Sequence, residues 1–146
     1  MAQSFFLEDT LSRIINPESA GKERTRLVKG VVLAIRELAK QREPGEDARD
    51  QAAFIALALA LISETIEASV VAWEKRDYWV KADKFRMEWV WSGDYAKNMK
   101  LAVINEDWES VTRVAAQIAK KLSKVNVPAG HRLGQPWVGA WRELLK

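Results

Sequence analysis

Hydrophobic residues recur along the first part of the chain at the spacing of amphipathic helices. Between residues 23 and 41 they stand at positions i, i+4, i+8 and i+11, and the charged residues lie off this stripe. A shorter stripe covers residues 4–15. Asn16-Pro17 follows the shorter stripe and Pro44-Gly45 follows the longer one, and both dipeptides are typical of loops. The pattern therefore predicts two helices, over residues 4–15 and 23–41.

The most apolar stretch of the chain is residues 52–62, where every position is hydrophobic. It belongs to a predicted helix that begins near Glu46 or Asp47 and continues to about Lys75, with acidic residues in its first turn. Because the first half is apolar on nearly every side, neighbouring helices must cover it. A bilayer span takes about 20 apolar residues. The helix near residues 47–75 is therefore predicted to be the centre of a bundle and not a membrane segment.

Residues 77–91 carry two neighbouring rows of mostly apolar residues at helical spacing. The first row is Tyr78, Ala82, Phe85 and Trp89, and the second is Val80, Lys84, Met87 and Trp91. Asp77 either caps a new helix or stands at a kink in a longer one, and the sequence leaves both possibilities open. Ser92-Gly93 is interpreted as the break that ends this segment.

The rest of the chain predicts three more helices. One follows Asp94, a second begins after an Asn105 cap and continues to about residue 125, and a short third covers residues 136–145. No segment shows the period-two alternation of a half-buried strand, and no long linker divides the chain. The sequence therefore predicts an all-α fold, a single-domain bundle of five to seven helices over residues 1–146.

Composition removes several kinds of chemistry. The chain has no cysteine, which excludes disulfides, thiolate-bound metals and cysteine nucleophiles. Its one histidine, His131, excludes multi-histidine metal sites and is interpreted as a loop residue. Neither a glycine-rich phosphate loop nor a nucleophile-elbow motif is present. The N-terminus lacks a basic signal-peptide start, so we expect a cytoplasmic protein, and we expect no cofactor.

Tryptophan is the most informative residue type here, with seven in 146 residues. In one continuous helix Trp89 and Trp91 would point about 200° apart, so both could not face the same partner. One is expected in the core, and the other beneath a neighbouring helix, a dimer partner or a ligand. Because tryptophan is enriched at interface hot spots, this pair is the candidate interface and indicates a homo-oligomer.

Two pairs of glutamates repeat the same spacing, Glu64 with Glu67 and Glu106 with Glu109. Residues at i and i+3 share a helix face, and carboxylates from two helices would suit Mg²⁺. This arrangement resembles the all-α nucleotide pyrophosphohydrolases, which use an E-x-x-E and E-x-x-D pair. The resemblance implies a Mg²⁺-dependent nucleotide hydrolase with these four glutamates as metal ligands. The alternative is that Glu64 and Glu67 form a salt-bridged helix edge, for example with Arg36 or Arg86.

Basic residues outnumber acidic ones by 23 to 20, and they gather towards the C-terminus. Four of them define a candidate nucleic-acid surface, which a second cluster at residues 22–29 could extend, and these four are Lys120, Lys121, Lys124 and Arg132. The alternative is a solvated helix face with cations at a helix C-terminus.

These observations rank three functions. The expected one is a non-enzymatic protein–protein interaction module that acts as a homo-oligomer with no membrane contact. A nucleic-acid-associated helical protein is the second, and the Mg²⁺-dependent hydrolase is the third. No motif in the sequence names the protein partner.

Overall fold

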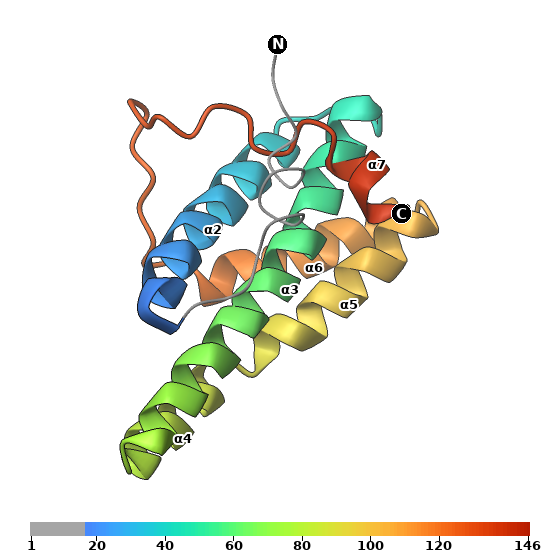
Figure 1. Ribbon diagram of the computed structural model, residues 1–146. Helices are drawn as coiled ribbons and strands as arrows, with labels where there is room; N and C mark the ends of the chain where they lie inside the picture. The colour runs from blue at the N-terminus through green and yellow to red at the C-terminus, as the bar shows by residue number, and fades with distance from the viewer. Residues whose placement is uncertain (1–16) are drawn as a thin grey trace.

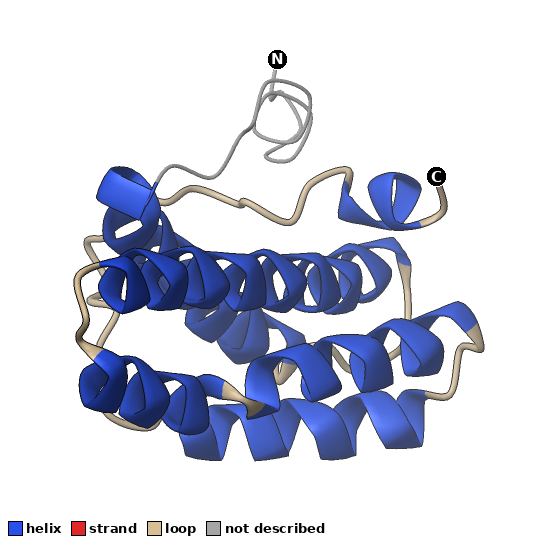
Figure 2. Ribbon diagram, turned by 60° about the horizontal axis from the view of Figure 1, so that its bottom comes forward, coloured by secondary structure: helices blue, strands red, loops and turns tan. Residues whose placement is uncertain are grey.

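The computed structural model describes residues 17–146 and confirms the all-α fold, with no strand in that part of the chain (Figures 1 and 2). These described residues form five helices of 11 or more residues and one of five residues. These are α2 (Pro17–Leu38), α3 (Glu46–Lys75), α4 (Trp79–Trp89), α5 (Trp91–Ile104), α6 (Trp108–Lys121) and α7 (Ala140–Leu144). The helix predicted over residues 4–15 lies outside the described residues.

Helix α3 is the centre of the bundle, and its bounds match the prediction. It packs against α2, α4, α5 and α7. Phe54, Ile55 and Leu59 from its first half are fully buried, together with Leu27 of α2 and Met99 of α5. Among the described residues, α3 is the helix whose length and composition would allow it to cross a membrane, and 56% of its apolar window is buried inside the bundle.

Helix α2 begins earlier than the stripe predicted. Pro17 is the first residue of the helix, where proline costs no hydrogen bond, and is not part of the preceding loop. The stripe itself is confirmed, since Leu27 and Val31 are fully buried. Gly30 brings α2 close to α3, because a Cβ atom at this position would lie 2.9 Å from the Phe54 ring.

The segment after α3 forms a separate helix, which settles the choice that the sequence left open. The chain turns at Asp77, whose φ of 63° lies in the left-handed region. The Tyr78 amide donates to the Trp73 carbonyl at 2.9 Å and closes the turn. Asp77 is therefore a turn residue, and Tyr78 holds the cap position of α4 without a side-chain bond.

The break after α4 falls at Val90, and the prediction of a break at Ser92-Gly93 is wrong. Both residues belong to the first turn of α5. Gly93 lies against α3, because an added Cβ atom would be 3.3 Å from Ser63 Oγ. This glycine allows a close approach of two helices and does not end one.

The cap of α6 is Asp107, so the prediction of an Asn105 cap is also wrong. Asn105 ends α5, and Asp107 Oδ1 accepts a hydrogen bond from the Ser110 amide at 3.2 Å. The Ser110 hydroxyl donates to Asp107 Oδ2 at 2.6 Å. These bonds from Ser110, the side-chain bond first, hold the pKa of Asp107 below its ordinary value.

The C-terminal helix is shorter than the predicted 136–145. Residues 136–139 form turns, and Gly139 adopts a φ of 84° immediately before α7. Trp137 and Leu144 are buried in the core. Asp50 of α3 accepts hydrogen bonds from the Trp141 amide at 2.9 Å and the Gly139 amide at 3.3 Å, which ties this segment to the bundle.

Candidate interaction surface on helix α4

The C-terminal half of α3 and the whole of α4 form an arm, at the lower left of Figure 1. Within the described residues, α4 packs mainly against α3. One face of α4 is therefore buried against α3, and much of its surface has no neighbouring helix.

The inner face of α4 consists of three residues of the first predicted row, and the fourth, Tyr78, is exposed at the cap position. Ala82 is fully buried, and Phe85 and Trp89 are half-buried. Phe85 meets Trp73 of α3 edge to face, with ring centroids 5.0 Å apart, and lies 6.5 Å from Trp89. Aromatic contacts of this kind add to the stabilisation from burial. This row fixes which face of α4 points outwards.

Trp89 and Trp91 correct the sequence prediction. Their rings stack with centroids 5.6 Å apart and planes 24° apart, and Trp91 continues to Tyr95 at 5.7 Å. The prediction of opposite directions assumed one continuous helix, whereas the helix is interrupted at Val90. Trp91 Nε1 donates to the Glu88 carbonyl at 3.1 Å, a group left free at the end of α4. Both indoles are half-buried parts of one aromatic row.

Two cations lie over this aromatic row. The Arg24 guanidinium of α2 is 4.7 Å from the centre of Phe85, and Lys81 Nζ is 4.5 Å from the centre of Trp73. Arg24 Nη1 also donates to Ser69 Oγ at 3.4 Å, and burial lowers the pKa of Arg24. Both cations therefore already have aromatic partners within the same chain.

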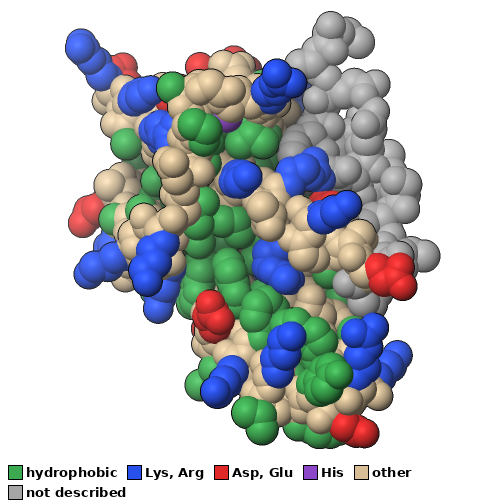
Figure 3. Space-filling view, turned by 90° about the vertical axis from the view of Figure 1, so that its left-hand side faces the viewer, with side chains coloured by type: hydrophobic (Ala, Val, Ile, Leu, Met, Phe, Trp, Pro, Cys, Tyr) green, Lys and Arg blue, Asp and Glu red, His purple; other side chains and the backbone are tan. Residues whose placement is uncertain are grey.

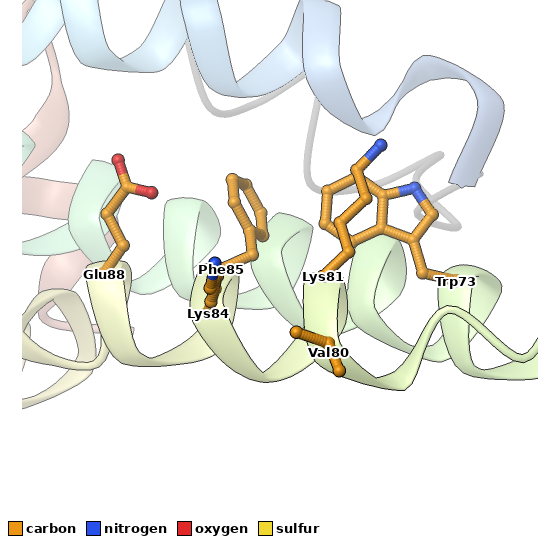
Figure 4. A pocket seen from close by; sticks show the side chains of 6 residues that line it. All are labelled: Trp73, Val80, Lys81, Lys84, Phe85 and Glu88. Atoms are coloured by element: carbon orange, nitrogen blue, oxygen red, sulfur yellow. The ribbon is translucent and has the colours of Figure 1, made fainter.

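A hollow of about 520 Å³ lies beside α4 (Figure 4). Trp73, Phe85 and Lys81 extend from the helices into this space, with Val80 and Lys84 on its outer side. The hollow is shallow and open to solvent, so it does not enclose a small molecule.

The outer face of α4 contains Val80, Lys84 and Met87 of the second predicted row, whereas the fourth member, Trp91, belongs to α5 and stacks on Trp89. Val80 is 71% exposed and Met87 is 72% exposed, and Val90 and Trp79 are also exposed. Figure 3 shows hydrophobic side chains on the lower lobe of the molecule, among lysines and arginines. Sequence reasoning recognised this row but did not expect it to lack a partner. We call Val80, Asp83, Lys84 and Met87 the outer face.

The four predicted metal ligands do not come together. Glu106 pairs at 2.8 Å with Arg49, near the start of α3. Glu64 is 15 positions after Arg49 on the same helix, which is about 22 Å along the helix axis. No group of three or more histidine or acidic side chains able to hold a metal occurs among the described residues. The predicted Mg²⁺ site is therefore not formed there.

The salt-bridged alternative for these glutamates is confirmed in part. Glu64, Glu67 and Glu109 are all exposed, and Glu67 pairs with Arg86 of α4 at 3.6 Å. Arg36, the other suggested partner, instead donates to the Val127 carbonyl at 2.8 Å. Glu67 thus helps to hold α4 against α3.

The candidate nucleic-acid residues are exposed around the end of α6 and the loop after it. These are Lys120 and Lys121 in the last turn of α6, with Lys124 and Arg132 beyond it. The second cluster contributes less than its sequence indicates, because Arg24 lies over Phe85 and Arg26 pairs with Glu23 at 2.6 Å. His131 Nδ1 accepts from the Leu133 amide at 3.2 Å, a local loop contact.

Comparison with known proteins assigns no family. No family model matches the chain, and no curated protein or solved structure is detectably similar to it. The geometry of α4 is therefore the main guide to function.

Proposed function

We propose that this helical bundle is a non-enzymatic protein-interaction module that self-associates through the outer face of α4. The observation that carries the proposal is the exposure of Val80 and Met87 one above the other on a helix whose opposite face is packed. Burying apolar surface gains about 25 cal/mol per Å². Large side chains that stay exposed together are typical of contact sites.

The hydrolase alternative has no support from the placement of its residues. Glu106 pairs with Arg49 at one end of α3, and Glu67 pairs with Arg86 towards the other. A Mg²⁺-dependent reaction needs carboxylates that converge on one ion. The nucleic-acid alternative retains its exposed lysines, so the experiment below includes an oligonucleotide.

The test is solution mass by light scattering over a range of protein concentrations, at two salt concentrations, with and without a mixed oligonucleotide. We expect the mass to rise from 16.6 kDa towards twice that value without the oligonucleotide, at both salt concentrations. The double variant Val80→Gln with Met87→Gln should remain a monomer. The control Leu101→Gln alters a similarly exposed residue on α5 and should self-associate normally.

Two results would contradict the proposal. One is a wild-type chain that stays monomeric at every concentration. The other is a mass that changes only with the oligonucleotide and only at low salt, which would transfer the function to Lys120, Lys121, Lys124 and Arg132.

A further inference from the structure

The outer face of α4 carries opposite charges on its two sides. Val80 and Met87 are seven positions apart, so they lie nearly in line along the helix. Asp83 and Lys84 stand between them, and with about 100° per residue they project to opposite sides of that line. The Asp83 side chain is 70% exposed, and Lys84 is exposed as well. An apolar line with an acid on one side and a base on the other can recognise a copy of itself.

We infer that two copies pair through α4 in parallel, about a two-fold axis that runs along the helix. This inference rests on the proposed function and names its partner as a second copy of this chain. The axis places Val80 against Val80 of the second copy and Met87 against Met87. It also places Asp83 of each copy beside Lys84 of the other, so two opposite-charge pairs flank the apolar line.

The charges select the parallel orientation. In an antiparallel pair centred on the same face, the acidic sides of the two copies meet each other, and so do the basic sides. Asp83 would then face Asp83, and Lys84 would face Lys84. Like charges opposed at a contact destabilise it, which is how interfaces reject wrong arrangements.

The existing contacts of Asp83 leave it available to a second copy. It lies 3.4 Å from Arg86, which also reaches Glu67 at 3.6 Å and Glu74 at 3.5 Å. Arg86 is thus shared among three carboxylates, and Asp83 is the most exposed of them.

The size of α4 limits the strength of the pair. The helix has 11 residues and is about 16 Å long. A stable interface buries roughly 1,200–2,000 Å² in total, and one short helix from each copy contributes less. We therefore expect a reversible dimer whose population rises with concentration.

Charge reversal tests the side-by-side pairs. Asp83→Lys and Lys84→Asp each place two like-charge contacts in the dimer, so each variant alone should self-associate about tenfold more weakly than wild type. A mixture of the two variants restores both opposite-charge pairs, so it should form a mixed dimer near wild-type strength. Both substitutions are on exposed positions, so each variant should keep its helices, which circular dichroism can check.

Single cysteines test the orientation independently, because the chain has no cysteine of its own. In a parallel pair, Val80→Cys should form a disulfide-linked dimer by itself under mild oxidation, and so should Met87→Cys. In an antiparallel pair, these variants should cross-link with each other and not with themselves. The control Leu101→Cys on α5 should give no comparable product.

The results separate this inference from the proposed function. A wild-type chain that is always monomeric overturns both. A wild-type dimer overturns the inference alone if the two charge variants still pair normally by themselves, or if Val80→Cys links only to Met87→Cys. A wild-type dimer with weakened single variants, a restored mixture and self-linking cysteines supports both.

Discussion

Asp50 shows how one side chain can place a segment far away in the sequence. Its two carboxylate oxygens accept the Gly139 and Trp141 amides, at sequence separations of 89 and 91. These amides belong to the start of α7, where backbone N–H groups lack partners within the helix. A five-residue helix does not persist alone, so its position depends on this contact and on the burial of Trp137 and Leu144.

Replacing Asp50 should therefore loosen the C-terminal segment. We expect Asp50→Ala to lower the free energy of unfolding by about 1–2 kcal/mol, as for the loss of a helix cap. Urea denaturation measures this loss of stability. Limited proteolysis should cleave the segment beyond residue 126 faster in the variant than in wild type. The control Asp47→Ala removes an exposed carboxylate from the same helix and should cost less. Equal stability of the two variants would show that the Asp50 contacts contribute little.

At the scale of single helices, the sequence predicted the long elements better than their ends. The stripes that produced α2 and the apolar run that produced α3 depend on burial, which contributes most to folding and is visible as periodicity. Helix ends depend on local hydrogen bonds and on neighbours. Ser92-Gly93 looked like a break, but Gly93 serves the contact with Ser63 of α3.

The candidate site was predictable in its residues but not in its role. The two rows of α4 follow from spacing alone, and three residues of the inner one, Ala82, Phe85 and Trp89, pack as expected, whereas Tyr78 is exposed. Two facts needed the structure. The helix is interrupted at Val90, which allows Trp89 and Trp91 to stack. Val80, Lys84 and Met87 of the second row face outwards, because no described helix beyond α3 packs extensively on α4.

The contact between α2 and α3 gives a paired prediction from two glycines of one helix. Gly30→Ala would place a methyl group 2.9 Å from the buried Phe54 ring, so we expect a loss of about 1–3 kcal/mol in unfolding free energy. Gly21→Ala meets only an Arg24 nitrogen at 3.8 Å, so better helix propensity should stabilise it by about 0.5–1 kcal/mol. Thermal or urea denaturation of both variants shows whether each substitution lowers or raises the free energy of unfolding. A Gly30→Ala variant as stable as wild type would mean that α2 can shift away from Phe54.

At the scale of the whole molecule, α3 joins a part that is packed on several sides to a part that has fewer neighbouring helices. Its first half is surrounded by α2, α5 and α7, and its second half supports α4 (Figure 1). Elements with few neighbours open more readily than a buried core. Binding of a second copy should therefore reduce local opening in the arm more than in the rest of the molecule.

Hydrogen exchange followed by mass spectrometry should show this difference and its dependence on association. In dilute protein, amides of α4 should exchange faster than those at the buried centre of α3, around Phe54 and Leu59. Raising the protein concentration should slow amide exchange in α4. Binding of a second copy stabilises the folded arm by mass action. Helix α6 serves as an internal reference whose exchange should stay constant. The double variant Val80→Gln with Met87→Gln should lose the concentration dependence while keeping the slow centre of α3. If exchange in α4 were independent of concentration in wild type, or if α6 were protected instead, the outer face would not be the contact surface.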